Sequence, residues 1–345
     1  MFVYKNFNFK GVMSFTGGHL IWITAWASLV TLLFEFTNWN WMTIPWLPLS
    51  LVGIAVAFYV GFKNNQSYDR LWEARKIWGG IVNSSRSWGI SVKAYVTNQF
   101  NDKSLTENDL QNIKKKLIYR HIAWLYALRS QLLISTPWEH INQNIHVARV
   151  TEKRRKTYGL GLIDDDYTMQ SLNQFLEDKE YESVLSAKNT ATQIIDRQSQ
   201  HLAQLRGENI IDDFRHIDLQ STLKQFYDYQ GMCERIKKFP FPRQYGAMSN
   251  IFVGIFIFLL PFGMIGQFAD IASWGTWLSI PFTVLVAWVF LVMELVGDYS
   301  ENPFEGLGND IPMLSLCRTI EIDLKEMLGE ADLPPTIEAK NGVLM

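Results

Sequence analysis

The chain has 345 residues, of which 48% are apolar and 14% aromatic, and its formal net charge is -2 at pH 7. This charge balance excludes a strongly basic nucleic-acid-binding domain, and the apolar content excludes a low-complexity disordered chain. The two cysteines, Cys233 and Cys317, are too few for a disulfide framework or a four-ligand zinc site. The mean hydropathy of -0.02 is typical of a soluble protein, but it averages two opposed kinds of segment.

Two long segments of the chain contain no Lys or Arg. They run from 11 to 62 and from 244 to 317, and basic residues are dense between them. Their apolar runs lie at about 20–36, 45–62, 251–268 and 277–296, and each is long enough to cross the ~30 Å hydrocarbon layer of a bilayer. Core helices of a soluble protein would also be apolar, but they would not explain the missing cations. We therefore predict four transmembrane helices.

The basic residues that flank these runs predict the topology. Lys and Arg occur before the first run, after the second, before the third and after the fourth. Because positive charge is retained on the cytoplasmic side, both termini and the middle region are expected in the cytoplasm, with the spans in the cell inner membrane. The expected outer ends carry an interfacial belt of tryptophans, namely Trp39, Trp41, Trp46, Trp274 and Trp277.

This topology divides the chain into four parts. Residues 1–62 form an N-terminal segment with a transmembrane hairpin, 63–243 a cytosolic helical region, 244–300 a second transmembrane hairpin, and 301–345 a cytosolic C-terminal segment. No period-two alternation appears in the middle region, so its elements are expected to be helices. The second span should continue as a helix toward residue 100, and further helices are predicted at 117–135, 167–178, 182–206 and 218–237. Ser104 and Glu107 resemble a capping box.

The sequence contains no pattern of enzymatic chemistry. A phosphate loop, a dinucleotide fingerprint, HExxH and GxSxG are all absent, and the six histidines show no metal-ligand spacing. We therefore expect neither an enzyme nor a metal centre. Glu294 and Asp298 lie one helical turn apart at the end of the fourth span. Ionisable groups in membranes suggest function, but a snorkelling or ion-paired structural role explains these two equally well.

One apolar pattern in the second span suggests a pore. Ile54, Phe58 and Phe62 are spaced i, i+4 and i+8, so they share one helix face. A ring of such helices would place three apolar collars around an axis, and a constriction of this kind can gate by dewetting. Lipid contact would explain the same stripe. Four spans cannot enclose much of a pore, so this interpretation requires an oligomer around a shared axis.

Two stretches resemble the bestrophin family, specifically its bacterial members. They are 61–86, GFKNNQSYDRLWEARKIWGGIVNSSR, and 301–330, ENPFEGLGNDIPMLSLCRTIEIDLKEMLGE. The recognisable signature positions are Arg70, Trp72, Glu73 and Arg75 in the first stretch and Asn302, Pro303 and Phe304 in the second. With two apolar hairpins around a helical middle, the resemblance covers nearly the whole chain.

The resemblance implies an all-α membrane protein with four transmembrane helices per subunit, assembled as a homopentamer around a central axial pore. The second span of each subunit would line the pore, with Ile54, Phe58 and Phe62 as its hydrophobic neck. The family has a second, cytosolic constriction, for which Ile217 is the candidate. Its members also carry an acidic calcium-binding run after the Asn-Pro-Phe turn. Here that run is Glu-Gly-Leu-Gly-Asn-Asp and lacks most of the carboxylates, so no cofactor and no calcium activation are expected.

The expected function is therefore passive conduction of small monovalent ions. A phenylalanine edge turned to the pore would favour anions, and a face would favour cations. By resemblance, animal bestrophins conduct anions, whereas a bacterial relative can favour cations. Phe58 at the middle neck position resembles the animal pattern and favours anions such as chloride. The expected partners are further copies of the chain, membrane lipids and the permeating ions, with no nucleic acid. The alternatives are a sodium-permeable channel, a non-conducting membrane-tethered scaffold, and a transporter, against which the dissimilar hairpins argue.

Overall fold

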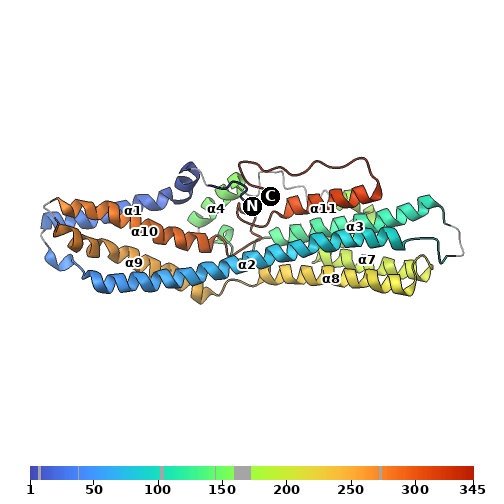
Figure 1. Cartoon of the computed structure of the whole chain (residues 1–345), viewed down its shortest axis with the longest axis horizontal. Helices are drawn as coiled ribbons and strands as arrows, with labels where there is room; N and C mark the ends of the chain where they lie inside the picture. The colour runs from blue at the N-terminus through green and yellow to red at the C-terminus, as the bar shows by residue number, and fades with distance from the viewer. Residues whose placement is uncertain (7–8, 38, 102–104, 144, 159–171, 272–273) are drawn as a thin grey trace. The chain divides into compact units, whose positions relative to one another are not determined.

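The computed structural model describes residues 1–6, 9–37, 39–101, 105–143, 145–158, 172–271 and 274–345 (Figure 1). Helices dominate this part of the chain, and its β pairing is limited to two isolated bridges near the chain ends. The expected all-α fold class is thus confirmed. The chain forms two compact units. Residues 4–70 and 240–301 form the membrane unit, and residues 1–3, 71–239 and 302–345 form the helical unit.

The membrane unit contains four helices that are long and apolar enough to cross a membrane. They are α1 (Phe9–Thr37), the first part of α2 (Trp46–Tyr95), α9 (Arg243–Ala269) and α10 (Gly275–Asp298), with a short 3-10 helix η1 (Asn40–Met42) between the first two. Helix α10 packs against both α1 and α9. These helices match the four predicted spans. As predicted, α2 continues far beyond the apolar run, and it ends at Tyr95.

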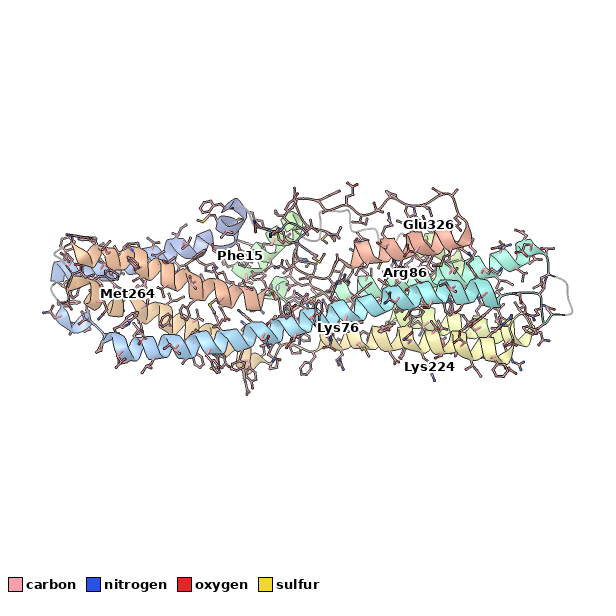
Figure 2. All side chains as sticks on the ribbon, viewed as in Figure 1. Phe15, Lys76, Arg86, Lys224, Met264 and Glu326 are labelled. Atoms are coloured by element: carbon pink, nitrogen blue, oxygen red, sulfur yellow. The ribbon has the colours of Figure 1, made fainter. Side chains whose placement is uncertain are left out.

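A compact apolar core holds the membrane unit together. It includes Ile23 of α1, Leu49 and Val60 of α2, and Met264 of α9, which is labelled in Figure 2. Burial of such side chains contributes about 25 cal/mol for each Å² removed from water, but inside a bilayer the contribution comes mainly from close packing. Gly263 shows how tight this packing is, since a methyl group there would lie 2.3 Å from Leu49 Cδ2.

The helical unit contains the remainder of α2 and most of the other helices. These are α3 (Glu107–Leu133), η2 (His140–Asn142), α4 (Ile145–Tyr158), α6 (Asp178–Leu185), α7 (Thr190–Gly207), α8 (Asp213–Lys238) and α11 (Met313–Leu328). Helix α3 is central, because it packs against α7, α8 and α11. The helical unit buries three tryptophans, namely Trp78 and Trp88 of α2 and Trp124 of α3. Arg86 of α2, labelled in Figure 2, pairs with Asp323 of α11 at 2.8 Å.

Two predicted helix boundaries are wrong. The helix predicted at 182–206 is two helices, α6 and α7, because the Asn189 side chain accepts the Thr192 N–H at 3.0 Å and starts a new helix. Helix α3 begins at Glu107 rather than near 117, and its capping box is formed by Thr106 and Asp109. Ser104, the predicted cap, lies outside the described residues, as does the first part, 167–171, of the helix predicted at 167–178.

Candidate functional site

The three predicted neck residues form an exposed row on α2. Ile54, Phe58 and Phe62 are 66%, 68% and 54% exposed, respectively. Their spacing makes the row ~12 Å long, because a helix rises 1.5 Å per residue. The neighbouring Val56 and Val60 are buried in the core of the membrane unit. One side of α2 is therefore packed inside the subunit, while the row is accessible to lipid, ions or another copy of the chain.

The buried side of α2 is fitted closely to α9. A methyl group at Gly53 would lie 2.9 Å from Cε2 of Phe256, so the glycine allows the helix backbone to approach that ring. Tyr59 packs edge-on against Phe252, with ring centroids 5.4 Å apart. These contacts, rather than the apolar pattern of α2 alone, select the face that is left exposed.

The two aromatic side chains of the row touch each other. The ring centroids of Phe58 and Phe62 are 4.5 Å apart, and their planes stand at 84°. Two planes at this angle cannot both turn their faces toward one axis. The edge of each ring carries the positive part of the aromatic quadrupole.

A polar node lies beside the row, and we define it as Lys63, Ser249, Glu294 and Asp298. The Lys63 ammonium contacts the Glu294 carboxylate, whose second oxygen accepts a hydrogen bond from the Ser249 hydroxyl. Asp298 Oδ1 lies 3.7 Å from Lys63 Nζ. The sequence offered snorkelling and ion pairing as structural roles for Glu294 and Asp298, and the structure shows ion pairing. Sequence reasoning did not identify Lys63 and Ser249 as their partners, although Lys63 is the first cation after a long cation-free segment.

The signature residue Arg70 and its neighbour Arg243 both contact Glu301 at the end of the membrane unit. Arg70 Nε donates to the carbonyl oxygen of Glu301 at 2.9 Å, and Arg243 lies 4.0 Å from the Glu301 carboxylate. This pairing joins α2 to the segment after α10. Arg70 therefore organises the fold of this unit in the structure.

The signature residues of the helical unit divide between its surface and its interior. Glu73 accepts a hydrogen bond from Arg235 at 2.6 Å, Trp72 is exposed, and Arg75 is half-buried. The turn formed by Asn302, Pro303 and Phe304 is buried, and the Pro303 carbonyl oxygen accepts the N–H of Ile311 at 3.2 Å.

The predicted cytosolic constriction, Ile217, lies on α8 in the helical unit. Its side chain is 64% exposed, and Phe214, one turn earlier, is exposed as well. The adjacent Asp218 accepts a hydrogen bond from the Tyr95 hydroxyl at 3.0 Å, which ties this part of α8 to the end of α2. Ile217 is therefore accessible on a helix whose position is fixed by its neighbours.

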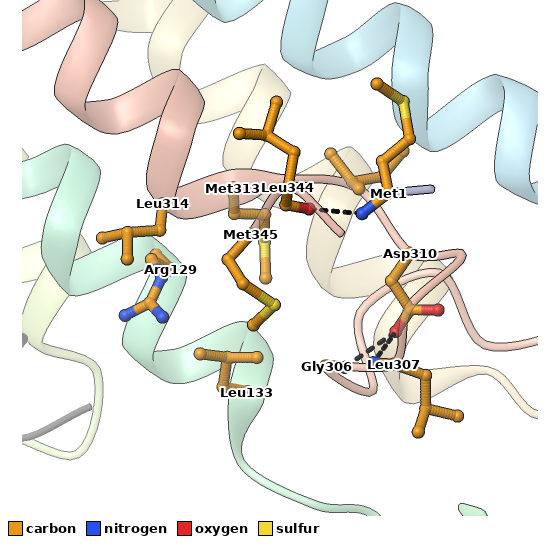
Figure 3. Close-up of a pocket in the computed structure, with 11 residues that line it drawn as sticks. Met1, Arg129, Leu133, Gly306, Leu307, Asp310, Met313, Leu314, Leu344 and Met345 are labelled. Atoms are coloured by element: carbon orange, nitrogen blue, oxygen red, sulfur yellow. Dashed lines mark hydrogen bonds between the residues drawn. The ribbon is translucent and has the colours of Figure 1, made fainter. Parts of the chain in front are cut away.

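The loop after the Asn-Pro-Phe turn uses its acids for internal contacts. Asp310 accepts the N–H groups of Gly306 and Leu307 at 2.7 and 3.0 Å (Figure 3). Glu305 pairs with Nδ1 of His140 at 2.9 Å. The Lys237 ammonium contacts both the Glu139 carboxylate and, at 3.3 Å, the Phe304 carbonyl oxygen. A lysine of the chain thus supplies positive charge next to this loop.

These residues do not fit a calcium site. Calcium takes six to eight oxygen ligands, with ionised carboxylates among them. Burial raises the pKa of Asp310 to about 7 and also raises the pKa of Glu139, so both ionise less readily than usual. Burial lowers the pKa of Lys237. Among the described residues, no group of three or more His, Cys, Asp or Glu side chains is arranged to hold a metal ion.

The fold and the site define a multi-pass helical membrane protein with an accessible apolar row on one membrane helix. The family model for "Bacterial/Fungal Bestrophin protein" matches residues 11–326. The chain therefore belongs to the bestrophin family, as the two sequence signatures predicted.

Individual relatives agree with this assignment. A protein from Ralstonia nicotianae, named a voltage-dependent anion channel-forming protein, is 28% identical over 86% of this chain and 82% of its own length. The protein of the same description from Escherichia coli K12, YneE, is 26% identical over 84% of this chain and 79% of its own length. A crystal structure of a bacterial bestrophin homologue from Klebsiella pneumoniae has a TM-score of 0.73 at 20% identity. It covers 91% of this chain and 98% of that chain, and at this identity it supports the fold alone.

Proposed function

We propose that the chain forms a homopentameric channel that conducts small monovalent ions passively through an axial pore. The exposed row of Ile54, Phe58 and Phe62 is the observation that carries this proposal. The row lies on a helix whose other side is packed within the subunit, so a ring of subunits would surround a hydrophobic neck. The names of the curated relatives support a channel and give no support to an enzyme.

We propose that the channel favours anions such as chloride. The neck carries no charged side chain, so discrimination there depends on weaker fields. The rings of Phe58 and Phe62 stand at 84°, so they cannot both turn their faces squarely to the pore, and a ring edge turned to the pore would favour an anion. The relatives named as anion channel-forming proteins support the same choice. Ile217 is the proposed second constriction, on the cytosolic side.

The proposed location is the cell inner membrane, with both termini and the helical unit in the cytoplasm. The absence of Lys and Arg from 11 to 62 and from 244 to 317 supports this orientation. The exposed Trp39, Trp41 and Trp274 support an interfacial belt at the other membrane surface. Membrane lipids would then cover the apolar faces of α1, α9 and α10 that are not used between subunits.

We also propose that the channel opens without calcium. The acids of the loop are engaged by backbone N–H groups and by His140, and the Lys237 ammonium lies beside the loop. A divalent cation would have to displace these contacts, and it would meet the positive charge of the lysine. These contacts support a loop that is already closed by the residues of the chain itself.

The proposal is tested by measuring the reversal potential of purified protein in planar bilayers under a salt gradient. We expect a shift toward the chloride equilibrium potential. A shift toward the cation potential would keep the channel and reverse the selectivity. No current from verified pentamers would favour the non-conducting scaffold.

The neck itself is tested with Phe58→Ala. This variant should raise flux or change selectivity, because it widens the middle of the row. Phe36→Ala on α1 is a matched control, since Phe36 is also an exposed phenylalanine of a membrane helix but lies outside the row. Equal flux and selectivity in Phe58→Ala and the parent would overturn the neck assignment.

A further inference from the structure

The polar node is next to the proposed neck in the sequence and in the fold. Lys63 directly follows Phe62 on α2, while Ser249 belongs to α9 and Glu294 to α10 (Figure 1). The side chains of Lys63 and Glu294 are 2% and 5% exposed. Three helices of the membrane unit therefore meet at one buried ion pair, and one of them is the neck helix.

A second contact ties the same turn of α2 to α10. Asn64 Nδ2 donates to the Met293 carbonyl oxygen at 2.9 Å. The two helices come close enough there that a methyl group at Gly297 would lie 2.0 Å from Asn64 Oδ1. The approach depends on the missing side chain of Gly297, and it carries no charge. The attachment of α2 at this level thus has an ionic part and a steric part.

Both contacts resist rotation of α2 about its own axis. Successive residues of a helix are about 100° apart, so a rotation that moves Phe62 away from its position also moves Lys63 away from Glu294. Separating a buried ion pair leaves two uncompensated charges in a medium of low polarity, which is strongly unfavourable. The fit of Gly53 to Phe256 and of Tyr59 to Phe252 holds the same rotation farther along α2, and the ion pair adds an electrostatic restraint at the end of the row.

We propose that Lys63 and Glu294 are positioning residues of the neck. Their ion pair, with Ser249 on Glu294 and the close approach of Asn64 to Gly297, sets the rotation of α2 so that Ile54, Phe58 and Phe62 face the pore. This inference rests on the proposed channel function. A merely structural pair would stabilise the subunit but leave the orientation of the row unchanged.

The first experiment measures the accessibility of the neck in assembled channels. Phe62→Cys is introduced into the parent and into the double variant Lys63→Met/Glu294→Gln, and its reaction with a membrane-impermeant thiol reagent is followed. The native Cys233 and Cys317 are buried and provide a low background. The double variant leaves neither charge unpaired, so it is expected to fold. We expect its modification rate to change about tenfold, which corresponds to about 1.4 kcal/mol of lost orientational preference.

The current through the same variants is measured in planar bilayers. The double variant should change the ratio of anion to cation permeability. The single variant Lys63→Arg keeps the charge and should retain the permeability ratio of the parent. A general loss of stability is controlled by Lys237→Met/Glu139→Gln. This variant neutralises the other buried lysine–glutamate pair, which belongs to the helical unit, and it should leave the modification rate at position 62 unchanged.

Gly297→Ala provides a test that changes no charge. The added methyl group should displace the Asn64 side chain from its contact with α10 and alter the modification rate of Phe62→Cys in the same direction as the double variant. Gly254→Ala on α9 is the matched control, because a methyl group at Gly254 would meet no atom within 4 Å. This pair of variants keeps the inference testable even if the charge variants do not assemble.

The outcomes separate the positioning role from the proposed function. If the parent conducts, and if modification of Phe62→Cys blocks the current at the same rate in the parent, the double variant and Gly297→Ala, the positioning role is overturned and the channel stands. If verified pentamers of the parent carry no current and Phe62→Cys does not react, both the channel and the positioning role are overturned.

Discussion

Each unit of the chain contains a buried lysine–glutamate pair, but the two pairs have different surroundings. Lys63 and Glu294 join membrane helices that expose large apolar side chains, including Phe58. Lys237 and Glu139 lie in a unit that buries Trp88 and Trp124 in its core. The same type of contact therefore joins membrane helices beside an exposed row in one unit and lies next to a buried loop in the other.

The comparison also shows what an exposed aromatic residue means in each unit. In the membrane unit, lipid or a neighbouring subunit can cover Phe58, so its exposure in the single chain marks a usable surface. In the helical unit, Trp88 and Trp124 are buried and provide stability, whereas Trp72 and Phe214 are exposed. We therefore expect substitution of Phe58 to change conduction and substitution of the buried tryptophans to change stability.

The largest expected effect is the loss of a buried tryptophan from the helical unit. Trp124→Ala removes a side chain that is packed against His121 and Phe226 and donates to Gln230 at 3.0 Å. It should lower the free energy of unfolding by about 3–5 kcal/mol. Phe58→Ala should change it by about 0.5 kcal/mol or less. Thermal unfolding of the detergent-solubilised protein compares the two, and equal losses would contradict the division between the units.

The next effect concerns the pair that closes the loop after the Asn-Pro-Phe turn. Lys237→Met leaves Glu139 without its cation and should cost about 3 kcal/mol of stability. Lys238→Met is the control, because the side chain of Lys238 is 68% exposed and pairs with Glu234 on the surface.

Addition of calcium or a chelator should not shift the unfolding temperature of the parent. A marked stabilisation by calcium would contradict the proposal of a calcium-independent loop.

A smaller effect is the pH dependence that His121 contributes. Burial among aromatic rings lowers the pKa of His121 from 6.5 to about 3. Below pH 6.5 the imidazole of His121 binds a proton in the unfolded chain but not in the folded chain. The free energy of unfolding therefore decreases as the pH falls from 6.5 toward 3. The loss is about 1.4 kcal/mol for each pH unit.

The matched variant is His121→Phe, which keeps an aromatic ring but cannot titrate. Ser85, the partner of His121 at 2.9 Å, still donates to the Ile81 carbonyl oxygen in this variant. The raised pKa of Asp310 acts in the opposite direction, but it is common to both proteins. Between pH 6.5 and 5.5 the free energy of unfolding should therefore decrease more in the parent than in His121→Phe. Equal slopes would contradict a neutral, buried His121.

The smallest expected effect on stability is at the proposed cytosolic constriction. Ile217→Ala removes an exposed side chain, so the free energy of unfolding should change by about 0.5 kcal/mol or less. The flux or the ion selectivity of the Ile217→Ala channel should nevertheless differ from that of the parent channel. Phe214→Ala on the same helix is the control, and it should change neither the flux nor the selectivity. A change in conduction with Phe214→Ala but not with Ile217→Ala would move the constriction to Phe214.

The sequence predicted the features that depend on composition over long windows. Apolar runs without Lys or Arg indicated four membrane helices, and the lack of alternation indicated helices elsewhere. Local features were predicted less well. Ser104 with Glu107 and Thr106 with Asp109 are competing capping patterns within a few residues, and the structure forms the second. The break at Asn189 was missed because a single capping side chain changes the periodicity of the surrounding residues very little.

The sequence by itself determined that this is a helical membrane protein of the bestrophin family with a candidate neck on its second span. It also identified Glu294 and Asp298 as unusual acids in a membrane helix. It did not pair Glu294 with Lys63 and Ser249, because these residues come from three helices far apart in the chain. Only tertiary packing brings them together. The same packing decides which face of α2 is buried, since the apolar residues of that helix are compatible with more than one rotation.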